Sequence, residues 1–356
     1  MKYILALNPG STSTKISLYE GEKEVFTKTL RHSAEELAPY DNVIEQYEFR
    51  LKTITEALKD AGIDLSDLRA VVGRGGLLRP IPSGTYEVNE RMIKDLSSAC
   101  YGEHASNLGG IIADALARKA ANGCRAFIAD PVVVDELSDV ARIGGHPMFP
   151  RLSIFHALNQ KAIAKLYAKQ AGVSYESLNL IVAHMGGGVS VAAHSKGKVV
   201  DVNNALYGEG PFSPERTGGI SAMQVADVCF SGKYTLAEVK KIISGKGGVV
   251  SHLGTNSFIE VENRVAAGDE KARLITDAFN YNVAKAIGGM AAALSGKVDA
   301  IILTGGIAYG KEMMRQITDM VSFIAPVKVY PGEDEMAALS GNALSVLEGR
   351  EKVKEY

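Results

Sequence analysis

Two short apolar segments, half a chain apart, each end on a polar side chain that is followed by a turn of small residues. The first ends on Asn8, and its turn carries Ser11 and Ser13 among four consecutive hydroxyl residues, followed by Lys15. Hydroxyls, backbone N–H groups and an ammonium are suited to holding phosphate. This turn is not a Walker A loop, because it leads into a second strand and not into a helix. The pattern predicts a phosphate-binding turn, against the alternative of an ordinary polar hairpin.

The second apolar segment ends on His184 and leads into three consecutive glycines, Gly186, Gly187 and Gly188. Without side chains, these residues let backbone N–H groups approach anionic oxygens closely. We expect them to form a phosphate cradle, although simple loop flexibility is an alternative.

Charged residues stand at two further expected strand ends and in one glycine-rich loop. Asp130 follows the apolar run 125–129 and precedes Pro131, and Arg74 stands among glycines after the run 68–73. In open α/β sheets, ligands bind outside the carboxyl ends of strands. A carboxylate there can bind Mg²⁺ or orient a nucleophile. Arg74 and Arg216 are suited to clamping a carboxylate or phosphate, although capping and surface roles remain open for all three.

The remaining candidates are histidines and an acidic helix start. His184 is the best placed, whereas His104 and His156 are expected on helices, where core or interface roles are equally open. The acidic run 333–335 opens the last expected helix, where favourable interaction with the helix dipole is a sufficient explanation.

Segments that repeat in the same order indicate how these residues are positioned. The two strand–turn–strand segments are each followed by a helix, a buried strand and a Gly-Gly pair, at 68–76 and again at 298–306. The repeat predicts two similar α/β domains with helices on both faces of each sheet. We place the N-terminal domain at residues 1–150 plus 336–356 and the C-terminal domain at 151–335.

The expected elements follow hydrophobic periodicity. We expect three strands in 3–30, a helix to about 61, a strand to 73, two helical pieces in 89–122, a strand at 125–129, irregular chain at 138–153, and helices at 153–170, from 220, from 236, at 271–294 and at 333–347.

Composition limits the possible functions. The 356 residues suffice for two domains, and a net charge of −2 gives no general attraction to nucleic acid or to an anionic membrane. The three cysteines lack metal-ligand spacing. No secretory leader or spanning run is recognised, so we expect a cytoplasmic protein.

The segments 5–15, 184–188 and 303–308 together resemble the acetate and butyrate kinase family, over essentially the whole chain. That family belongs to the superfamily of actin, sugar kinases and heat-shock chaperones. The resemblance implies a duplicated ribonuclease H-like, actin-like ATPase fold of two domains with an interdomain cleft. It implies phosphoryl transfer from ATP, with Mg²⁺, to a short-chain carboxylic acid, giving ADP and an acyl phosphate. It also suggests a homodimer or higher homo-oligomer.

The resemblance assigns roles by position. Arg74, Asp130, His184 and Arg216 are the implied catalytic residues, with His184 stabilising the transition state. The implied substrate-binding residues are Arg74, Gly76, His104, Phe155, His156 and Tyr207. The implied nucleotide-binding residues are Asn8, Ser11, Ser13, Lys15, Gly186, Gly187, Gly188, Gly305, Gly306 and Ile307. The implied magnesium residues are Asn8, Asp130 and Glu335.

Two positions depart from the acetate-specific members of the family. These have His-Arg followed by two valines, whereas this chain has Gly73-Arg74-Gly75-Gly76, and they have Asn where Gly187 stands. We expect the missing side chains to leave room for a longer acyl tail, because each buried methylene contributes about 0.8 kcal/mol. The expected acceptor is therefore butyrate, with a branched C4–C5 acid or acetate as alternatives.

Two rival functions remain at this point. A sugar kinase or polyphosphate phosphohydrolase would use Asp130 as a base, although the two arginines favour an anionic acceptor. An actin-like or chaperone-like module would use ATP only as a conformational switch, without arginines at the γ-phosphate.

Overall fold

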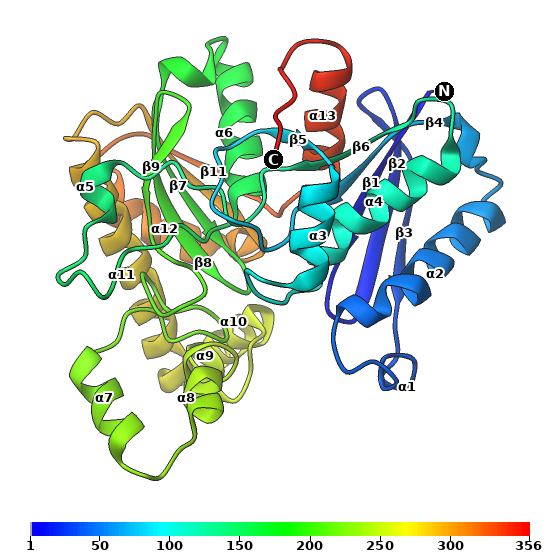
Figure 1. Ribbon diagram of the computed structural model, residues 1–356. Coiled ribbons are helices and arrows are strands. Elements are labelled where there is room, and N and C mark those ends of the chain that lie inside the picture. The colour runs from blue at the N-terminus through cyan, green and yellow to red at the C-terminus, as the bar shows by residue number, and fades with distance from the viewer. Residues whose placement is uncertain (1) are drawn as a thin grey trace. The chain divides into compact units, whose positions relative to one another are not determined.

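The structure, a computed structural model that describes residues 2–356, divides into two α/β units (Figure 1). The first holds the described residues up to Val134 together with Asp334–Tyr356, and the second is Asp135–Glu333. The chain thus passes from the first unit to the second between Val134 and Asp135. The boundary expected from the sequence, at residue 150, lies further along the chain.

The first unit is built on a sheet of six strands in the order β3-β2-β1-β4-β6-β5. Antiparallel pairing joins β1 to β2, β2 to β3 and β5 to β6, and parallel pairing joins β1 to β4 and β4 to β6. The bounds are β1 (Tyr3–Pro9), β2 (Ser13–Glu20), β3 (Lys23–Arg31), β4 (Leu68–Arg74), β5 (Thr85–Glu87) and β6 (Arg125–Ala129).

Helices cover both faces of this sheet because its inner strands are apolar on both faces. Leu5 and Leu7 of β1 pack into a core with α2 and α4, whereas the alternate residues of β1 face the side on which α13 packs against β1 and β4. The helices are α1 (Ala34–Leu37), α2 (Tyr47–Asp60), α3 (Glu90–Ser98), α4 (Asn107–Ala120) and α13 (Glu335–Leu347), with 3-10 turns at Ile44–Gln46 and Leu65–Asp67.

The second unit is built on a sheet of five strands in the order β11-β10-β7-β8-β9. Antiparallel pairing joins β7, β8 and β9, and parallel pairing joins β7 to β10 and β10 to β11. The bounds are β7 (Asn179–Met185), β8 (Val189–Ser195), β9 (Lys198–Val202), β10 (Ala300–Gly305) and β11 (Val327–Pro331).

Helices also cover both faces of the second sheet. One face packs on α11 and α12 through residues such as Ile181 and Leu303, and the other packs on α6 through Val182 and Ile302. The helices are α5 (Asp139–Arg142), α6 (Ala157–Ala171), α7 (Ala222–Phe230), α8 (Leu236–Ile243), α9 (Val249–Leu253), α10 (Phe258–Ala266), α11 (Glu270–Ala293) and α12 (Lys311–Val321), with 3-10 turns η3 (Tyr175–Ser177) and η4 (Gly306–Tyr309).

The two sheets share one topology. Read in the same direction, β3-β2-β1-β4-β6 of the first sheet corresponds to β9-β8-β7-β10-β11 of the second, with the same parallel and antiparallel pairings. The predicted duplicated α/β fold is confirmed. β1 and β7, which end near Asn8 and His184, are equivalent strands.

Several elements, and the positions of two histidines, differ from those expected from the sequence. The edge strands β5 and β11 and the helices α9, α10 and α12 are not predicted. His104 lies in the loop before α4, and His156 is the residue that precedes α6, so neither lies within a helix as expected. Among residues 2–356, we find no helix with the length and apolar character needed to cross a membrane.

Candidate active site

Three predicted site residues stand at the carboxyl ends of adjacent parallel strands in the first unit. Asn8 lies at the end of β1, Arg74 at the end of β4, and Asp130 directly after β6. The register pairs Leu7 with Gly73 and Arg74 with Ala129, so the three strands end at nearly the same level. This is the sheet edge at which α/β proteins bind ligands.

Asn8, Arg74 and Glu335 contact one another, although they are far apart in sequence. Arg74 Nη1 lies 3.2 Å from Glu335 Oε2 and 3.4 Å from Asn8 Oδ1, and the Asn8 amide donates a hydrogen bond to Glu335 Oε2. Glu335 comes from the first turn of α13, which is capped by the Asp334 side chain. The cluster combines one cation, one carboxylate and one amide.

The backbone around Asp130 is held in an unusual conformation. Its φ is +37°, a left-handed value that non-glycine residues adopt rarely. Asp130 Oδ1 accepts hydrogen bonds from Ser83 Oγ at 2.6 Å and from the Gly84 N–H at 2.8 Å. The following proline disfavours a right-handed helical conformation at Asp130. This carboxylate is therefore fixed at the strand end by its own backbone and by the loop before β5.

The predicted phosphate turn between β1 and β2 is held from behind by Arg50 of α2. Arg50 donates to the carbonyl oxygens of Gly10 and Ser13 at 2.8 and 3.1 Å, to Ser11 O at 3.0 Å, and to Thr14 Oγ1 at 3.0 Å. Because these carbonyl groups point inward at the guanidinium, the turn is held in one conformation.

Arg50 is a functional candidate that sequence analysis misses. It is fully buried, and its Nε and Nη2 both donate to Gln46 Oε1, so the partners of its guanidinium named here are neutral oxygens. Burial lowers the pKa of Arg50 to about 10, so it remains a cation at neutral pH. The signal in the sequence is its position: Arg50 occupies the apolar stripe of the helix formed by Tyr47, Leu51, Ile54 and Leu58.

In the second unit, His184 and His156 form a stacked pair at the end of β7. Their ring centroids are 4.0 Å apart, with 21° between the planes. The Asn159 amide donates to His184 Nδ1 at 2.9 Å, and His184 Nε2 lies 3.4 Å from Glu333 Oε2. His156 Nδ1 lies 2.9 Å from Ser190 Oγ. The structure therefore brings together two of the histidines that the resemblance assigns to the site.

Arg216 and His156 both pack against Gly188. A Cβ atom at Gly188 would lie 2.0 Å from Arg216 Nη1 and 3.2 Å from His156 Cε1. Arg216 donates to Ala205 O at 2.8 Å, and burial lowers the pKa of its guanidinium below the usual value without removing its charge at neutral pH. Gly188 is required here because its missing side chain lets the arginine and the histidine approach the glycine turn.

The other glycines of the predicted nucleotide site differ in their surroundings. Gly187 is exposed, and a Cβ atom there would meet nothing within 4 Å, which is also true of Gly306. Gly305 ends β10 with φ of +95°, and a Cβ atom would lie 2.3 Å from Met185 O. Ile307 is buried in η4, so its side chain belongs to the core.

Other predicted site residues differ in exposure. Lys15, Ser11 and His104 are exposed, and His104 Nδ1 lies 2.8 Å from Ser106 Oγ. Tyr207 is 59% exposed, whereas Phe155 is buried next to His156 in the chain.

The structure overturns one argument about the acyl tail. A Cβ atom at Gly76 would lie 2.5 Å from Asn107 Cα, and one at Gly75 would lie 2.5 Å from Pro131 Cβ. The space beside these glycines is therefore filled by neighbouring residues and is not left open for substrate. Gly75 and Gly76 are needed for close packing, so their presence does not itself indicate a longer acyl acceptor.

The donor set of the first unit suits magnesium in part. Asp130, Glu335 and Asn8 offer carboxylate and amide oxygens, the ligands that Mg²⁺ prefers, and Mg²⁺ bound with a nucleotide takes only one or two protein carboxylates. Within the described residues, no three His, Cys, Asp or Glu side chains form a ready metal cluster. These residues fit an ion that phosphate oxygens help to bind, and not a self-sufficient protein cage.

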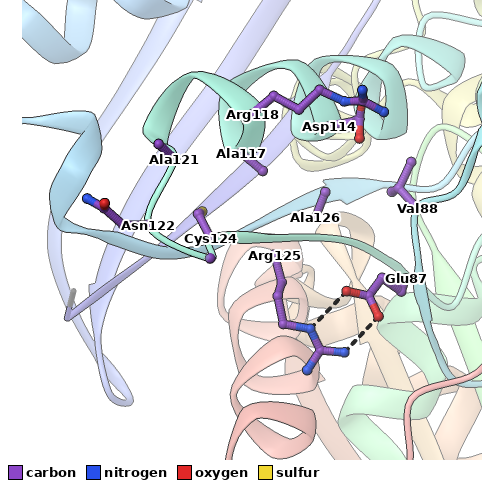
Figure 2. Close-up of a pocket in the computed structure, with 11 residues that line it drawn as sticks. Glu87, Val88, Asp114, Ala117, Arg118, Ala121, Asn122, Cys124, Arg125 and Ala126 are labelled. Carbon is purple, nitrogen blue, oxygen red and sulfur yellow. Dashed lines mark hydrogen bonds and ion pairs between the residues drawn. The ribbon is translucent and has the colours of Figure 1, made fainter.

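A separate pocket of the first unit lies near the beginning of β6, at the end of that strand opposite Asp130 (Figure 2). Arg125 donates to Glu87 at 2.9 and 2.8 Å, and Arg118 donates to Asp114 at 2.7 Å. Burial raises the pKa of Cys124 to about 11, so its thiol is protonated. With both guanidinium groups paired and the thiol unreactive, this pocket has no chemistry that competes with the strand-end clusters.

Comparison with known proteins shows the family to which the chain belongs. A family model described as "Acetokinase family" matches residues 151–330. Butyrate kinase 2 and butyrate kinase 1 of Clostridium acetobutylicum are 58% and 57% identical to this chain, and each match covers 100% of both proteins. The chain belongs to the acetokinase family.

A crystal structure of acetate kinase from Porphyromonas gingivalis shares the fold. Its TM-score is 0.82 over 98% of this chain and 100% of that one, at 19% sequence identity. The predicted fold class is therefore confirmed by this match as well as by the sheet topology. The acetokinase family is also the one that the three glycine-containing segments resemble.

Proposed function

We propose that this protein is a butyrate kinase, which catalyses butyrate + ATP ⇌ butanoyl phosphate + ADP. The observation that carries the proposal is 58% identity along the full length of both chains to a protein named butyrate kinase 2. The clusters of charged and donor groups at the strand ends support it, because phosphoryl transfer between two anions requires charge neutralisation and alignment.

The reaction does not require the protein to supply a strong base. A carboxylate is already ionised at pH 7 and attacks the γ-phosphorus directly, so the oxygen–phosphorus bond to the acid forms as the bond to ADP breaks. Catalysis then depends on holding the two reactants in line and on stabilising charge on the transferred group. Asp130 is accordingly proposed to organise Mg²⁺ and not to remove a proton.

We assign the recognition of anionic groups to two arginines. Arg74 belongs to the cluster with Asn8 and Glu335, and Arg216 lies against Gly188 with His156. A guanidinium remains charged and can bind two oxygens of one carboxylate or phosphoryl group. We propose that Arg74 and Arg216 hold the carboxylate and the transferring group.

The glycine turn and the stacked histidines are proposed to bind the phosphates of ATP. Gly186, Gly187 and Gly188 offer backbone N–H groups without side-chain obstruction, and Gly305 and Gly306 are proposed to lie against adenosine. His184 and His156 would donate hydrogen bonds to the transferring group. Asn8, Asp130 and Glu335 would hold Mg²⁺, which neutralises phosphate charge when bound.

A hydroxamate trap for acyl phosphate tests the function directly. Purified protein is incubated with ATP, Mg²⁺, hydroxylamine and either acetate, butyrate, isobutyrate or isovalerate. The proposal requires hydroxamate formation with the highest kcat/KM for butyrate. A higher value for a branched acid or for acetate would reassign the substrate within the acetokinase family. Slow ATP hydrolysis that none of the acids changes would instead indicate an actin-like ATP switch.

We further propose that the protein is a homo-oligomer located in the cytoplasm. The resemblance to the family suggests the assembly, and α7 supports it: none of its side chains is buried, with Met223 71% and Phe230 92% exposed. Exposed apolar side chains grouped on one helix are typical of an interface. Light scattering of the wild type should give a multiple of 37.9 kDa, and Phe230→Glu should lower it.

A further inference from the structure

A chain of buried hydrogen bonds runs behind His156 in the second unit. It links Tyr175 Oη to His194 Nδ1 at 2.7 Å, His194 Nε2 to Gln160 Oε1 at 3.0 Å, Gln160 Nε2 to Ser190 Oγ at 2.8 Å, and Ser190 Oγ to His156 Nδ1 at 2.9 Å. Gln160, Ser190 and His194 are completely buried. The chain thus joins the core between α6 and β8 to one ring of the stacked histidine pair.

A backbone carbonyl fixes the donors and acceptors in this series of hydrogen bonds. Gln160 Nε2 also donates to the main-chain oxygen of Ser190 at 3.0 Å. A carbonyl oxygen only accepts hydrogen bonds, so the amide nitrogen of Gln160 must face Ser190 and its oxygen must face His194. His194 therefore donates from Nε2.

His194 is neutral, and this fixes the direction of the hydrogen bond between Tyr175 and His194. Complete burial and the nearby Lys161 ammonium hold the pKa of His194 well below its ordinary value of 6.5. Lys161 is itself committed to Glu136 Oε2 at 2.6 Å and to Gly197 O at 2.8 Å. A neutral imidazole with its proton on Nε2 accepts at Nδ1, so the Tyr175 hydroxyl donates to His194.

Assigning the donors and acceptors around Ser190 also locates the ring proton of His156. Ser190 Oγ accepts a proton from Gln160, and its own hydroxyl proton has His156 Nδ1 as its acceptor. A buried hydroxyl proton without an acceptor would be costly. When the His156 ring is neutral, Nδ1 is therefore an acceptor and the ring proton is on Nε2.

We propose that Ser190 and Gln160 are positioning residues that fix the tautomer of His156, so that this ring offers an N–H and not a lone pair at Nε2. The role in catalysis rests on the proposed function. His156 packs with Arg216 against Gly188, next to the turn assigned to phosphate. A lone pair there would repel anionic oxygens, whereas an N–H donates to them.

Ser190→Ala tests the proposal because it removes one hydroxyl and leaves almost no cavity. Ser190→Thr retains the hydroxyl as a rescue variant. Ser17→Ala is the matched control, since Ser17 is also a completely buried strand serine whose hydroxyl lies 2.7 Å from a side-chain oxygen, that of Thr27. The ¹⁵N spectrum of labelled histidine, assigned with His156→Gln, reports the tautomer in the intact protein without substrate.

We expect the wild type to show His156 protonated at Nε2 and Ser190→Ala to show a mixture of tautomers. In the kinase assay, Ser190→Ala should lower kcat up to ~10-fold with KM for butyrate little changed, as expected for losing one neutral hydrogen bond. Ser190→Thr should recover both properties.

Two results would overturn the proposal: an unchanged His156 tautomer in Ser190→Ala, or an equal loss of kcat in Ser17→Ala. The spectrum is independent of turnover. Suppose that the wild type forms no acyl phosphate but Ser190→Ala changes the His156 tautomer as expected. This result would contradict the proposed function, and not the positioning of His156.

Discussion

The imidazole rings of His156 and His184 stack with their centroids 4.0 Å apart, although one ring precedes α6 and the other ends β7. Each ring accepts a hydrogen bond at Nδ1, from Ser190 and from Asn159 respectively. Both rings therefore carry their proton on Nε2 when neutral. Two parallel donors next to a glycine turn and Arg216 suit the recognition of an anionic group better than proton abstraction.

Removing either arginine should abolish most of the activity. We expect Arg74→Ala and Arg216→Ala each to lower kcat by ~10²–10³-fold, because each variant lacks a charged donor that we propose for the carboxylate and the transferring group. The hydroxamate assay measures this change. Arg350→Ala is the control, since Arg350 is exposed and forms an ion pair with Glu348, two residues before it. Near-normal turnover in both test variants would contradict the assigned roles.

Adjacent glycines of the turn should respond differently to the same substitution. In Gly188→Ala, the added Cβ would meet Arg216 at 2.0 Å, so the arginine must move and kcat should fall by at least ~10². In Gly187→Ala, the Cβ meets nothing within 4 Å, and activity should remain within a few-fold of the wild type. Steady-state kinetics measure kcat for the two variants. An equal loss of kcat in both would show that the placement of Arg216 is not the reason why Gly188 is required.

Arg50→Met should disturb the first phosphate turn. The substitution removes the guanidinium donor from the carbonyl groups of Gly10 and Ser11, whereas Ser13 O keeps its hydrogen bond from the Gly10 N–H. Each carbonyl group that is left unsatisfied away from water costs about 1–3 kcal/mol. Urea unfolding should show the loss of stability, and calorimetric titration should show weaker ADP binding.

Lys52→Met controls for the change in charge and helix composition, since the Lys52 side chain is 76% exposed on the same helix. Arg50→Lys should recover only part of the stability, because one ammonium cannot reach all four partners of the turn. Unaltered ADP affinity in Arg50→Met would show that the turn does not contact the nucleotide.

Stability should fall as the pH drops below about 6.5, partly because His194 is buried in the neutral form. Its pKa is lowered in the folded state, so between the folded and unfolded values the unfolded chain binds more protons. The free energy of unfolding therefore decreases by up to about 1.4 kcal/mol per pH unit in this window and is unaffected by His194 above it.

Thermal unfolding of the wild type and of His194→Gln between pH 5 and 8 measures this contribution. The variant should show a shallower decline at acidic pH, with a remaining slope to which His32 contributes, because burial first and Arg50 second lower the pKa of His32. Parallel profiles for the two proteins would contradict a neutral buried His194.

The strand ends were predictable from the sequence because buried parallel strands are continuous apolar runs that stop abruptly. Asn8, Arg74, Asp130 and His184 follow such runs, and the structure places each at a strand end. Edge strands lack this signal: β11 has the sequence Val-Lys-Val-Tyr-Pro and is largely exposed, and β5 has only three residues.

The supporting side chains could not be predicted in the same way. Arg50 reaches the first turn across about forty positions of sequence, and Gln160 and Ser190 meet only because α6 packs on the sheet beside β8. Hydrophobic periodicity locates elements and does not say which polar groups meet between them. The close packing at Gly75 and Gly76 likewise depends on Pro131 and Asn107, and no local pattern shows it.

The contact between Asn8 and Glu335 joins the carboxyl end of β1 to α13, two elements that lie far apart in the sequence but within the same unit (Figure 1). During synthesis on the ribosome, β1 emerges first and α13 emerges last, whereas the second unit is one uninterrupted stretch from Asp135 to Glu333. Domains generally fold as units as they emerge. The second unit can therefore complete its fold on the nascent chain before α13 is made, and Glu335 can contact Arg74 only after the whole second unit has been synthesised.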